Sequence, residues 1–319
     1  MKSTAIKFGS LILASTIILY ATQQVFKYTM QSCKIGTIGK INAVMDHSLD
    51  KEVTIWGAST ALLNFNPQVL SDSLGYSTVN MGVDGTSIDQ YGGLLQEYLS
   101  YTKNSKYIVI AIDIHGGITN RNSLYNLHNW IHHIDNDRIY TFLSDIDEPR
   151  VWKIRHIPFY ALTQYDKHAF PFFRRSFLQK KTEYSITNNG YHPNGYGHIN
   201  IDFEYDSAKK QSIAIGTRCL NKIRTLSLKA RSLGITPIVA ITPCYVKGFN
   251  QLVNAQEVIL LLRELGGHGI RVLDYSQSEM SSSFMFFKDN THLNENGAIE
   301  LSRLLASDIN RIEQEPKDL

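Results

Sequence analysis

The residues best suited to chemistry lie near the two ends of the chain. A Gly-Ala-Ser sequence ending at Ser59 follows a short apolar run, and Asp289 stands three residues before His292 just ahead of the last predicted helix. An Asp at this distance can accept a hydrogen bond from one imidazole nitrogen, which leaves the other nitrogen free to take the proton of a serine. The sequence therefore predicts a nucleophile at Ser59, a base at His292 and an orienting acid at Asp289. A serine after a strand more often caps a helix or a turn, so the interpretation of Ser59 depends on the Asp-His pair.

A second candidate element is the Asn-Met-Gly sequence ending at Gly82, which follows another apolar run. Glycine lets the backbone turn sharply and point an N–H group at a developing oxyanion, where such donors stabilise the transition state. Taken alone, Gly82 indicates only a turn.

Together these motifs resemble the SGNH, or GDSL-like, hydrolase superfamily. The resemblance rests on Ser59 in Gly-Ala-Ser, on Gly82 in Asn-Met-Gly and on the pattern D-x-x-H-L-N-x-x-G from Asp289 to Gly297. It covers most of the chain outside the N-terminal segment and one long insertion. It implies Ser59 as nucleophile, His292 as base, Asp289 as orienting acid, and the Ser59 and Gly82 amides as oxyanion donors.

The third oxyanion donor of that family has no direct counterpart here. The usual motif, G-x-N-D, supplies an Asn side chain after the third strand, whereas residues 111–117 of this chain are A-I-D-I-H-G-G. Three alternatives are open: His115 donates instead, Asn120 reaches back from the following loop, or Asp113 is a structural acid outside the oxyanion hole. Because an ionised Asp113 would repel an oxyanion, we rank His115 first.

The elements that must position these residues alternate between strand and helix. Apolar runs predict five strands, at 53–57, 76–81, 107–112, 237–242 and 270–275. Periodic stretches predict helices at 67–74, 87–101, 207–232, 251–265 and 294–312. Such alternation favours an α/β fold with a parallel sheet, whose ligands bind beyond the carboxyl ends of the strands. The motif order also matches the flavodoxin-like three-layer α/β/α sandwich of the resembling family.

Residues 115–205 interrupt this alternation and are predicted to form an insertion or cap. The segment holds 17 of the chain's aromatic residues and 8 of its 11 histidines. Four of its aromatic residues surround one proline: Phe170, Phe172, Phe173 and Phe177. They are candidates for a sugar-stacking surface, although packing within the insertion is the favoured alternative. The Asn- and Gly-rich loop at 188–197 is either a surface excursion or a flap over the site.

No cofactor and no metal site are predicted. His128, His132 and His133 have a helical spacing that places two ligands on one face, but no H-E-x-x-H motif accompanies them. The three cysteines form no C-x-x-C pair and allow at most one disulfide.

The N-terminal segment is a predicted membrane anchor. Lys2 and Lys7 precede an uncharged stretch over 8–26, which is just long enough for a span of about 20 residues. No A-x-A cleavage site follows it, and Cys33 lies several polar residues beyond the apolar core, unlike the lipidated cysteine of a lipoprotein. A cleaved signal peptide is the alternative, and both interpretations export the rest of the chain.

These features predict a three-part organisation. We expect an anchor or signal segment at 1–28, a linker at 29–51, and an SGNH-like domain at 52–319 that lies in the periplasm or at the cell surface.

The expected function is serine-dependent hydrolysis or transfer of an acyl group, with acetyl favoured, on an acylated envelope polysaccharide. Transfer would add a membrane acyl-donor protein as a partner. The net charge of +3, from 32 basic and 29 acidic residues, argues against a nucleic-acid partner. Two alternatives remain: a non-catalytic binding or assembly component of polysaccharide export, and a lipid esterase at the membrane surface with the same triad.

Overall fold

The computed structural model describes residues 2–178, 184, 186–199 and 210–315. Its centre is a sheet of five parallel strands in the order β2-β1-β3-β4-β5. The strands are β1 (Val53–Trp56), β2 (Thr78–Asn80), β3 (Tyr107–Ile112), β4 (Thr236–Ile241) and β5 (Arg271–Asp274). This order is that of flavodoxin-like doubly wound sheets, and it confirms the predicted α/β fold.

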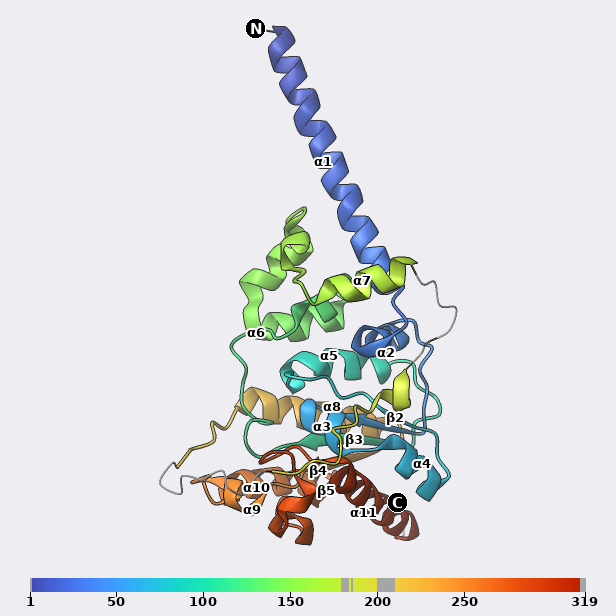
Figure 1. Ribbon diagram of the computed structural model, residues 1–319, viewed down its shortest axis with the longest axis vertical. Coiled ribbons are helices and arrows are strands. Elements are labelled where there is room, and N and C mark those ends of the chain that lie inside the picture. The colour runs from blue at the N-terminus through green and yellow to red at the C-terminus, as the bar shows by residue number, and fades with distance from the viewer. Residues whose placement is uncertain (1, 179–183, 185, 200–209, 316–319) are drawn as a thin grey trace.

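Helices cover both faces of the sheet, because side chains that alternate along each strand enter two separate cores. In β1, Trp56 faces one core and Ile55 the other, and both are fully buried. The first core is closed by α5 (Ile88–Tyr98), α8 (Thr217–Ser232) and α10 (Ala255–Arg263). The second is closed by α3 (Ser59–Asn64), α4 (Pro67–Leu74) and α11 (Glu295–Gln314). The result is the predicted three-layer sandwich (Figure 1).

The long helix α1 (Lys2–Gln31) projects from the sandwich (Figure 1). Its part over Ile6–Gln31 is long and apolar enough to cross a membrane, a criterion of length and composition that a signal sequence also meets.

The stretch predicted as a linker at 29–51 is structured instead. It contains α2 (Gly36–Met45), in which Ile38, Ile41 and Val44 recur every three residues and are buried. This apolar face packs into the domain, and its helical periodicity explains why the stretch forms a helix. The polar residues around it obscure that periodicity in the sequence.

The segment between β3 and α8 lies over α5, α2 and the lower end of α1 (Figure 1). Its described elements are η1 (Leu127–Asn129), η2 (Ile131–His133), α6 (Asp137–His156), η3 (Tyr160–Gln164), α7 (Ala169–Leu178) and η4 (Thr187–Gly190). The predicted start of the helix at 207–232 falls at 207–209, outside the described residues, and α8 begins at Thr217. The remaining short elements are α9 (Val246–Phe249), η5 (Glu264–His268), η6 (Glu279–Ser282) and η7 (Phe284–Phe286).

The phenylalanines of the insertion pack at the lower end of α1. The rings of Phe173 and Phe26 stack with centroids 4.1 Å apart, and Phe172 packs against a small cluster that includes Met30. Phe170 and Phe177 are exposed. Phe172 and Phe173 therefore pack mainly against α1 and its neighbours, whereas packing within the insertion was favoured; within the described residues, the one ring contact of that kind among the four is Phe177 on Phe173, with centroids 6.0 Å apart.

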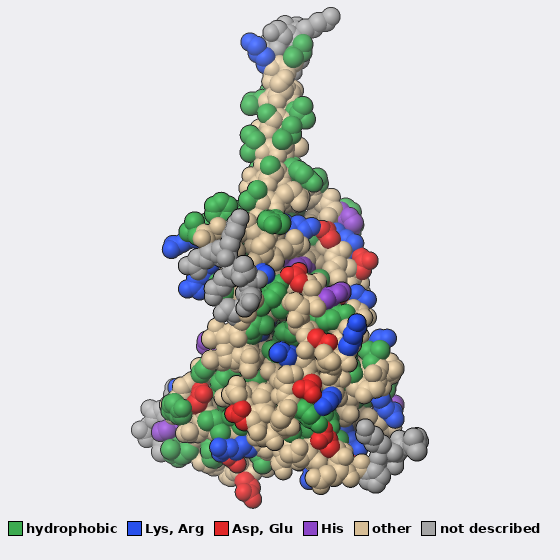
Figure 2. All heavy atoms as spheres, turned by 90° about the vertical axis from the view of Figure 1, so that its right-hand side faces the viewer, with side chains coloured by type: hydrophobic (Ala, Val, Ile, Leu, Met, Phe, Trp, Pro, Cys, Tyr) green, Lys and Arg blue, Asp and Glu red, His purple; other side chains and the backbone are tan. Residues whose placement is uncertain are grey.

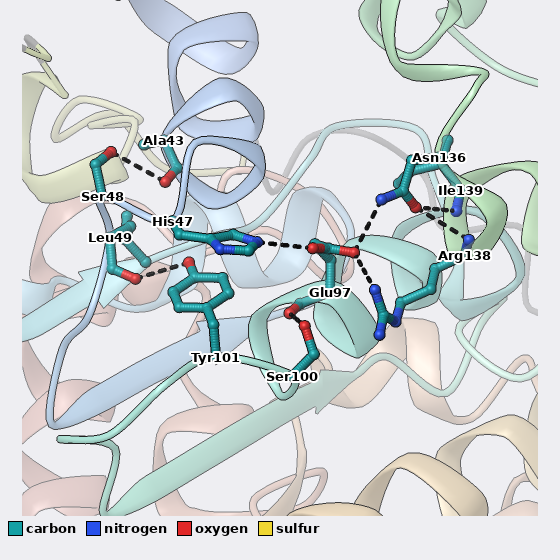
Figure 3. Close-up of polar contacts among 10 residues, drawn as sticks. All are labelled: Ala43, His47, Ser48, Leu49, Glu97, Ser100, Tyr101, Asn136, Arg138 and Ile139. Carbon is teal, nitrogen blue, oxygen red and sulfur yellow. Dashed lines mark hydrogen bonds and ion pairs between the residues drawn. The ribbon is translucent and has the colours of Figure 1, made fainter.

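A buried carboxylate joins three helices beside this insertion (Figure 3). Glu97 of α5 contacts His47, which follows α2, at 2.8 Å, and Arg138 of α6 at 2.6 Å. Asn136 donates a further hydrogen bond to the same carboxylate at 2.9 Å. The network fixes α2 and α6 on α5.

Candidate active site

Ser59 is the first residue of α3 and stands at the carboxyl edge of the sheet, directly after β1. Gly57 makes the sharp exit from the strand possible, since a Cβ atom there would lie 2.8 Å from the Ala111 carbonyl oxygen. The helix therefore starts close to β3 and presents the Ser59 hydroxyl beyond the strand ends.

The structure brings Ser59, His292 and Asp289 into one hydrogen-bonded chain, although 230 positions separate the first from the others in sequence. The Ser59 hydroxyl lies 2.8 Å from His292 Nε2, and His292 Nδ1 lies 2.7 Å from Asp289 Oδ2. Because the carboxylate accepts the Nδ1–H, Nε2 carries the lone pair that faces the serine proton. This is the arrangement required for general-base activation of a hydroxyl.

The loop itself holds Asp289 in place. Its Oδ1 accepts the backbone N–H groups of Thr291 and His292, both at 2.9 Å. Burial opposes ionisation of Asp289, but the hydrogen bonds from His292 and Thr291 outweigh it and lower its pKa from 3.8 to about 2. The carboxylate is thus ionised over the whole range in which an imidazole titrates.

Carboxylates also set the protonation of the imidazole. Burial lowers the pKa of His292, but the hydrogen bond and charge of Asp289, followed by the charges of Asp113 and Asp84, raise it above 6.5 overall. A general base works in its neutral form, so activity is expected to rise with pH through this raised pKa.

Asn64, which the sequence interpretation missed, ties the nucleophile to the base. It is buried at the end of the helix that Ser59 begins, and its amide donates to the Thr291 carbonyl at 2.8 Å and accepts the Leu293 N–H at 2.9 Å. These two bonds bracket His292. The sequence shows only an Asn five residues after Ser59, and neither its burial nor its partners can be read from that spacing.

Gly82 does not fit the predicted role of oxyanion donor in this conformation. Its N–H donates to Asn80 Oδ1 at 2.9 Å and is therefore already used. The glycine is required for close packing instead, since a Cβ atom there would lie 2.4 Å from the Leu62 nitrogen. The third predicted donor, the Ser59 amide, enters none of the hydrogen bonds found among the described residues.

A buried lysine supports this loop from behind. Lys40 of α2 is 3% exposed and donates to the carbonyls of Gly82 at 2.6 Å, Gly190 at 3.1 Å and Asn80 at 3.3 Å. Burial lowers its pKa to about 7. Lys40 thus connects α2, the loop after β2 and the start of the 188–197 loop, a role that its place in an apparent linker concealed.

His115 does not supply the replacement donor either. Its Nε2 lies 3.3 Å from Cys244 Sγ, while the Cys244 thiol donates to the Tyr245 carbonyl at 3.6 Å. Burial raises the pKa of Cys244 to about 12, so the thiol keeps its proton and its sulfur accepts the Nε2–H of His115. Burial also lowers the pKa of His115, which favours the neutral ring, and its Nε2 is already engaged by Cys244.

The other two alternatives for this stretch are separated by their contacts. Asp113 closes a turn, because its Oδ1 accepts the Gly116 N–H at 2.9 Å and its carbonyl accepts the Gly117 N–H at 3.0 Å. Asn120 Oδ1 accepts the Cys219 N–H at 3.1 Å at the start of α8. The geometry favours Asp113 as a structural acid and assigns Asn120 to the joint with α8.

The loop at 188–197 lies against the site, which favours the flap over a free surface excursion. The His192 N–H donates to the Leu62 carbonyl at 3.1 Å, and the Asn194 amide donates to the Leu293 carbonyl at 2.9 Å. These contacts attach the loop both to α3 and to the residue after His292.

The three histidines considered as metal ligands have partners inside the insertion and on α2. His132 and His133 both contact Asn42 Oδ1, at 3.2 and 2.6 Å, and His128 pairs with Asp166 at 3.2 Å. Within the described part of the chain, no group of three or more His, Cys, Asp or Glu side chains has a geometry that could hold a metal ion.

Comparison with known proteins adds the following. No family model and no curated protein sequence matches this chain. Among solved structures, it is similar to one described as a lipolytic protein of the G-D-S-L family from Desulfitobacterium hafniense, with 12% identity, a TM-score of 0.39, and coverage of 80% of this chain and 98% of that one. It is also similar to one described as an acylhydrolase from Bacteroides fragilis, with 16% identity, a TM-score of 0.36, and coverage of 82% and 86%. Similarity at this level carries no argument about activity, which must come from the site itself.

Proposed function

We propose that this chain is a serine-dependent acyl-ester hydrolase or acyltransferase. The observation that carries the proposal is the continuous chain of contacts from Ser59 Oγ to His292 Nε2 at 2.8 Å and from His292 Nδ1 to Asp289 Oδ2 at 2.7 Å. Three side chains from two distant segments meet at the carboxyl edge of a parallel sheet, where ligands bind in folds of this type.

The geometry supports a two-step reaction. Ser59 Oγ attacks the ester carbonyl carbon while its proton moves to His292 Nε2, and His292 then gives that proton to the departing alkoxide. Water or a second hydroxyl attacks the resulting acyl-serine, passes its proton to His292, and restores the free Ser59 hydroxyl. Asp289 holds the imidazole in its tautomer and stabilises the imidazolium in both steps. Hydrolysis and transfer differ only in the second nucleophile.

We further propose that the acyl group is neutral, with acetyl favoured. Asp84 and Asp113 both lie close enough to His292 to raise its pKa, so the surroundings of the imidazole are negative. An anionic acyl group would be repelled there. We further propose an acetylated envelope polysaccharide as the substrate, with the domain held outside the cytoplasmic membrane by α1. The support for this step is the apolar length of α1 together with the exported character that both sequence interpretations of it share.

A second candidate is a binding component that keeps the fold without turnover. It is favoured by the engaged Gly82 amide and by the contact of His115 Nε2 with Cys244, which leave the Ser59 amide as the one predicted donor without a partner among the described residues. Loss of one oxyanion donor typically lowers the rate about a hundred- to a thousand-fold. Slow turnover is therefore expected even if the triad works.

Labelling with a fluorophosphonate probe separates the two candidates. We expect the folded full-length chain to be labelled, and Ser59→Ala to lose the label completely. Ser73→Ala is the matched control, because Ser73 is an exposed helix residue of α4 whose hydroxyl bonds only to the Val69 carbonyl. Labelling that survives in Ser59→Ala, or no labelling of the parent chain beside a reactive serine hydrolase, contradicts the enzyme proposal.

Substrate class is tested by acetate release from acetylated polysaccharide and by fatty-acid release from phospholipid vesicles. Acetate alone supports the proposal, and fatty acid alone supports the lipid esterase alternative.

A further inference from the structure

An apolar and basic surface surrounds the lower end of α1. Its exposed apolar members are Trp152 and Ile157 at the end of α6, and Phe170, Phe177 and Leu178 of α7, each between 42% and 67% exposed. Figure 2 shows hydrophobic and basic side chains gathered where the helical stem meets the domain. We call this set the foot surface.

The domain holds the last turns of α1 rigidly. Gln23 Oε1 accepts the Phe159 N–H at 2.9 Å, the ring of Phe26 stacks on Phe173, and the Gln31 amide donates to the His132 carbonyl at 2.7 Å. Lys27 forms an ion pair with Asp135. Residues 23–31 of α1 are therefore part of the folded domain, and the residues before them are not.

The uncharged part of α1 that is free of the domain is too short to lift the domain away from a bilayer. It follows Lys7 and comprises residues 8–22, which are all exposed; at about 1.5 Å per residue these 15 residues span about 22 Å. The hydrocarbon core of a bilayer is about 30 Å thick. If α1 crosses it, the boundary of the hydrocarbon must reach Gln23, which is the level at which the chain around Phe159 touches α1.

From this we propose that the foot surface is seated in the headgroup layer of the bilayer that α1 crosses. The proposal rests on α1 as a membrane span and does not depend on the serine chemistry.

The side chains of the foot surface suit this environment. Tryptophan and phenylalanine favour the boundary between headgroups and acyl chains, and lysine and arginine bind lipid phosphates. Lys153, Lys167, Arg174 and Arg175 are exposed on the same segments. Of the exposed acids near them, Asp135 and Asp137 pair with Lys27 and Arg155, and Asp166 is a third. The balance is positive, so we expect a preference for anionic phospholipid. Such seating fixes both the height and the orientation of the domain relative to the membrane.

Tryptophan fluorescence provides a direct test, because the chain has three tryptophans and two of them, Trp56 and Trp130, are fully buried while Trp152 is 45% exposed. The full-length protein is placed in vesicles of phosphatidylcholine and phosphatidylglycerol that carry bromine on the upper acyl chain. We expect bromolipid to quench the emission and aqueous iodide to have little effect. Trp152→Phe removes the quenched component.

A charge variant then tests the surface as a whole. Phe170→Glu with Phe177→Glu is expected to restore iodide quenching of Trp152 and to leave hydrolysis of a soluble ester unchanged, whereas Leu304→Glu, an exposed leucine of α11, changes neither. Iodide quenching without bromolipid quenching in the parent chain overturns the proposal and leaves the foot surface to a protein partner. Release of the full chain from the vesicles by alkaline carbonate overturns it as well, because α1 is then no span. Failure of ester hydrolysis contradicts only the proposed function.

Discussion

Two histidine-carboxylate pairs in this molecule have almost the same geometry and different surroundings. His292 lies 2.7 Å from Asp289, and His47 lies 2.8 Å from Glu97. In the first pair the second imidazole nitrogen faces the Ser59 hydroxyl. In the second pair the imidazole ring stacks on Tyr101 with centroids 4.2 Å apart, and none of the hydrogen bonds found among the described residues joins it to a serine.

The carboxylates differ as much as the imidazoles do. Asp289 serves only its own loop, through His292 and the Thr291 amide. The Glu97 carboxylate is divided among His47, which follows α2, and Asn136 and Arg138 at the start of α6, and its side chain is 6% exposed. In this molecule, the pair whose carboxylate contacts several helices has a structural role. The pair whose carboxylate contacts only its own loop, and whose second imidazole nitrogen faces a hydroxyl, is arranged as a general base.

The largest difference between the two pairs is expected when each imidazole is removed in turn. His292→Ala is expected to lower kcat/KM for a small acetyl ester by about 10⁴- to 10⁶-fold, because it removes the base that contacts Ser59 in the described part of the chain. His47→Ala, the matched control, should retain turnover within about tenfold while the melting temperature falls. Steady-state kinetics and thermal unfolding of both variants measure kcat/KM and the melting temperature. Equal losses of activity would mean that the two pairs are not functionally distinct.

Removing the acid of the active-site pair has a smaller effect. Asp289→Asn is expected to reduce kcat by about 10²- to 10⁴-fold, because the imidazole loses its fixed tautomer but keeps its place beside Ser59. Asp289 raises the pKa of His292, so its replacement lowers that pKa, and the acid limb of the pH-rate profile moves to lower pH. An acid limb that stays in place would show that another group sets it.

Replacement of Lys40, which lies behind the site, tests how much the supporting contacts contribute to activity. Lys40→Met leaves three buried carbonyls, those of Asn80, Gly82 and Gly190, without their common donor. We expect a loss of about tenfold in kcat/KM and a lower melting temperature, since each unsatisfied buried group costs about 1 to 3 kcal/mol. Lys103→Met, on an exposed turn, is the control. An unchanged rate in Lys40→Met would mean that the loop after β2 does not position the site.

The sequence predicted the active-site pair far better than the structural one. Asp289 and His292 are three residues apart in a loop, so their contact is local and visible in the spacing. Strands such as 107–112 were also found, because a wholly apolar β-branched run has few other interpretations. The pair of His47 and Glu97 is 50 positions apart and depends on the packing of α2, which was hidden in a predicted linker. The contacts of the predicted oxyanion donors were also hidden in the sequence: the Gly82 amide is engaged through the side-chain orientation of Asn80, two residues before it, and His115 contacts Cys244, which lies 129 positions away.

The smallest effect on activity, and a clear effect on stability, is expected from Glu97→Gln. The amide oxygen can still accept a hydrogen bond from Arg138 or Asn136. The side chain loses, however, the negative charge that pairs with both His47 and the Arg138 guanidinium. The new NH₂ group also takes the place of one acceptor oxygen and faces a hydrogen-bond donor. Arg138 is 41% exposed, which weakens its share of the loss, so we expect the free energy of unfolding to fall by about 1 to 3 kcal/mol at neutral pH.

Burial opposes ionisation of Glu97, yet its bonds to His47, Asn136 and Arg138 lower its pKa below 4.5. The stabilisation from this carboxylate is therefore present above pH 4.5 and lost as the pH falls through the lowered pKa, so the parent and Glu97→Gln should converge in denaturant titrations at acid pH. A constant difference between them down to pH 3 would show that the network stabilises the fold through packing and not through charge.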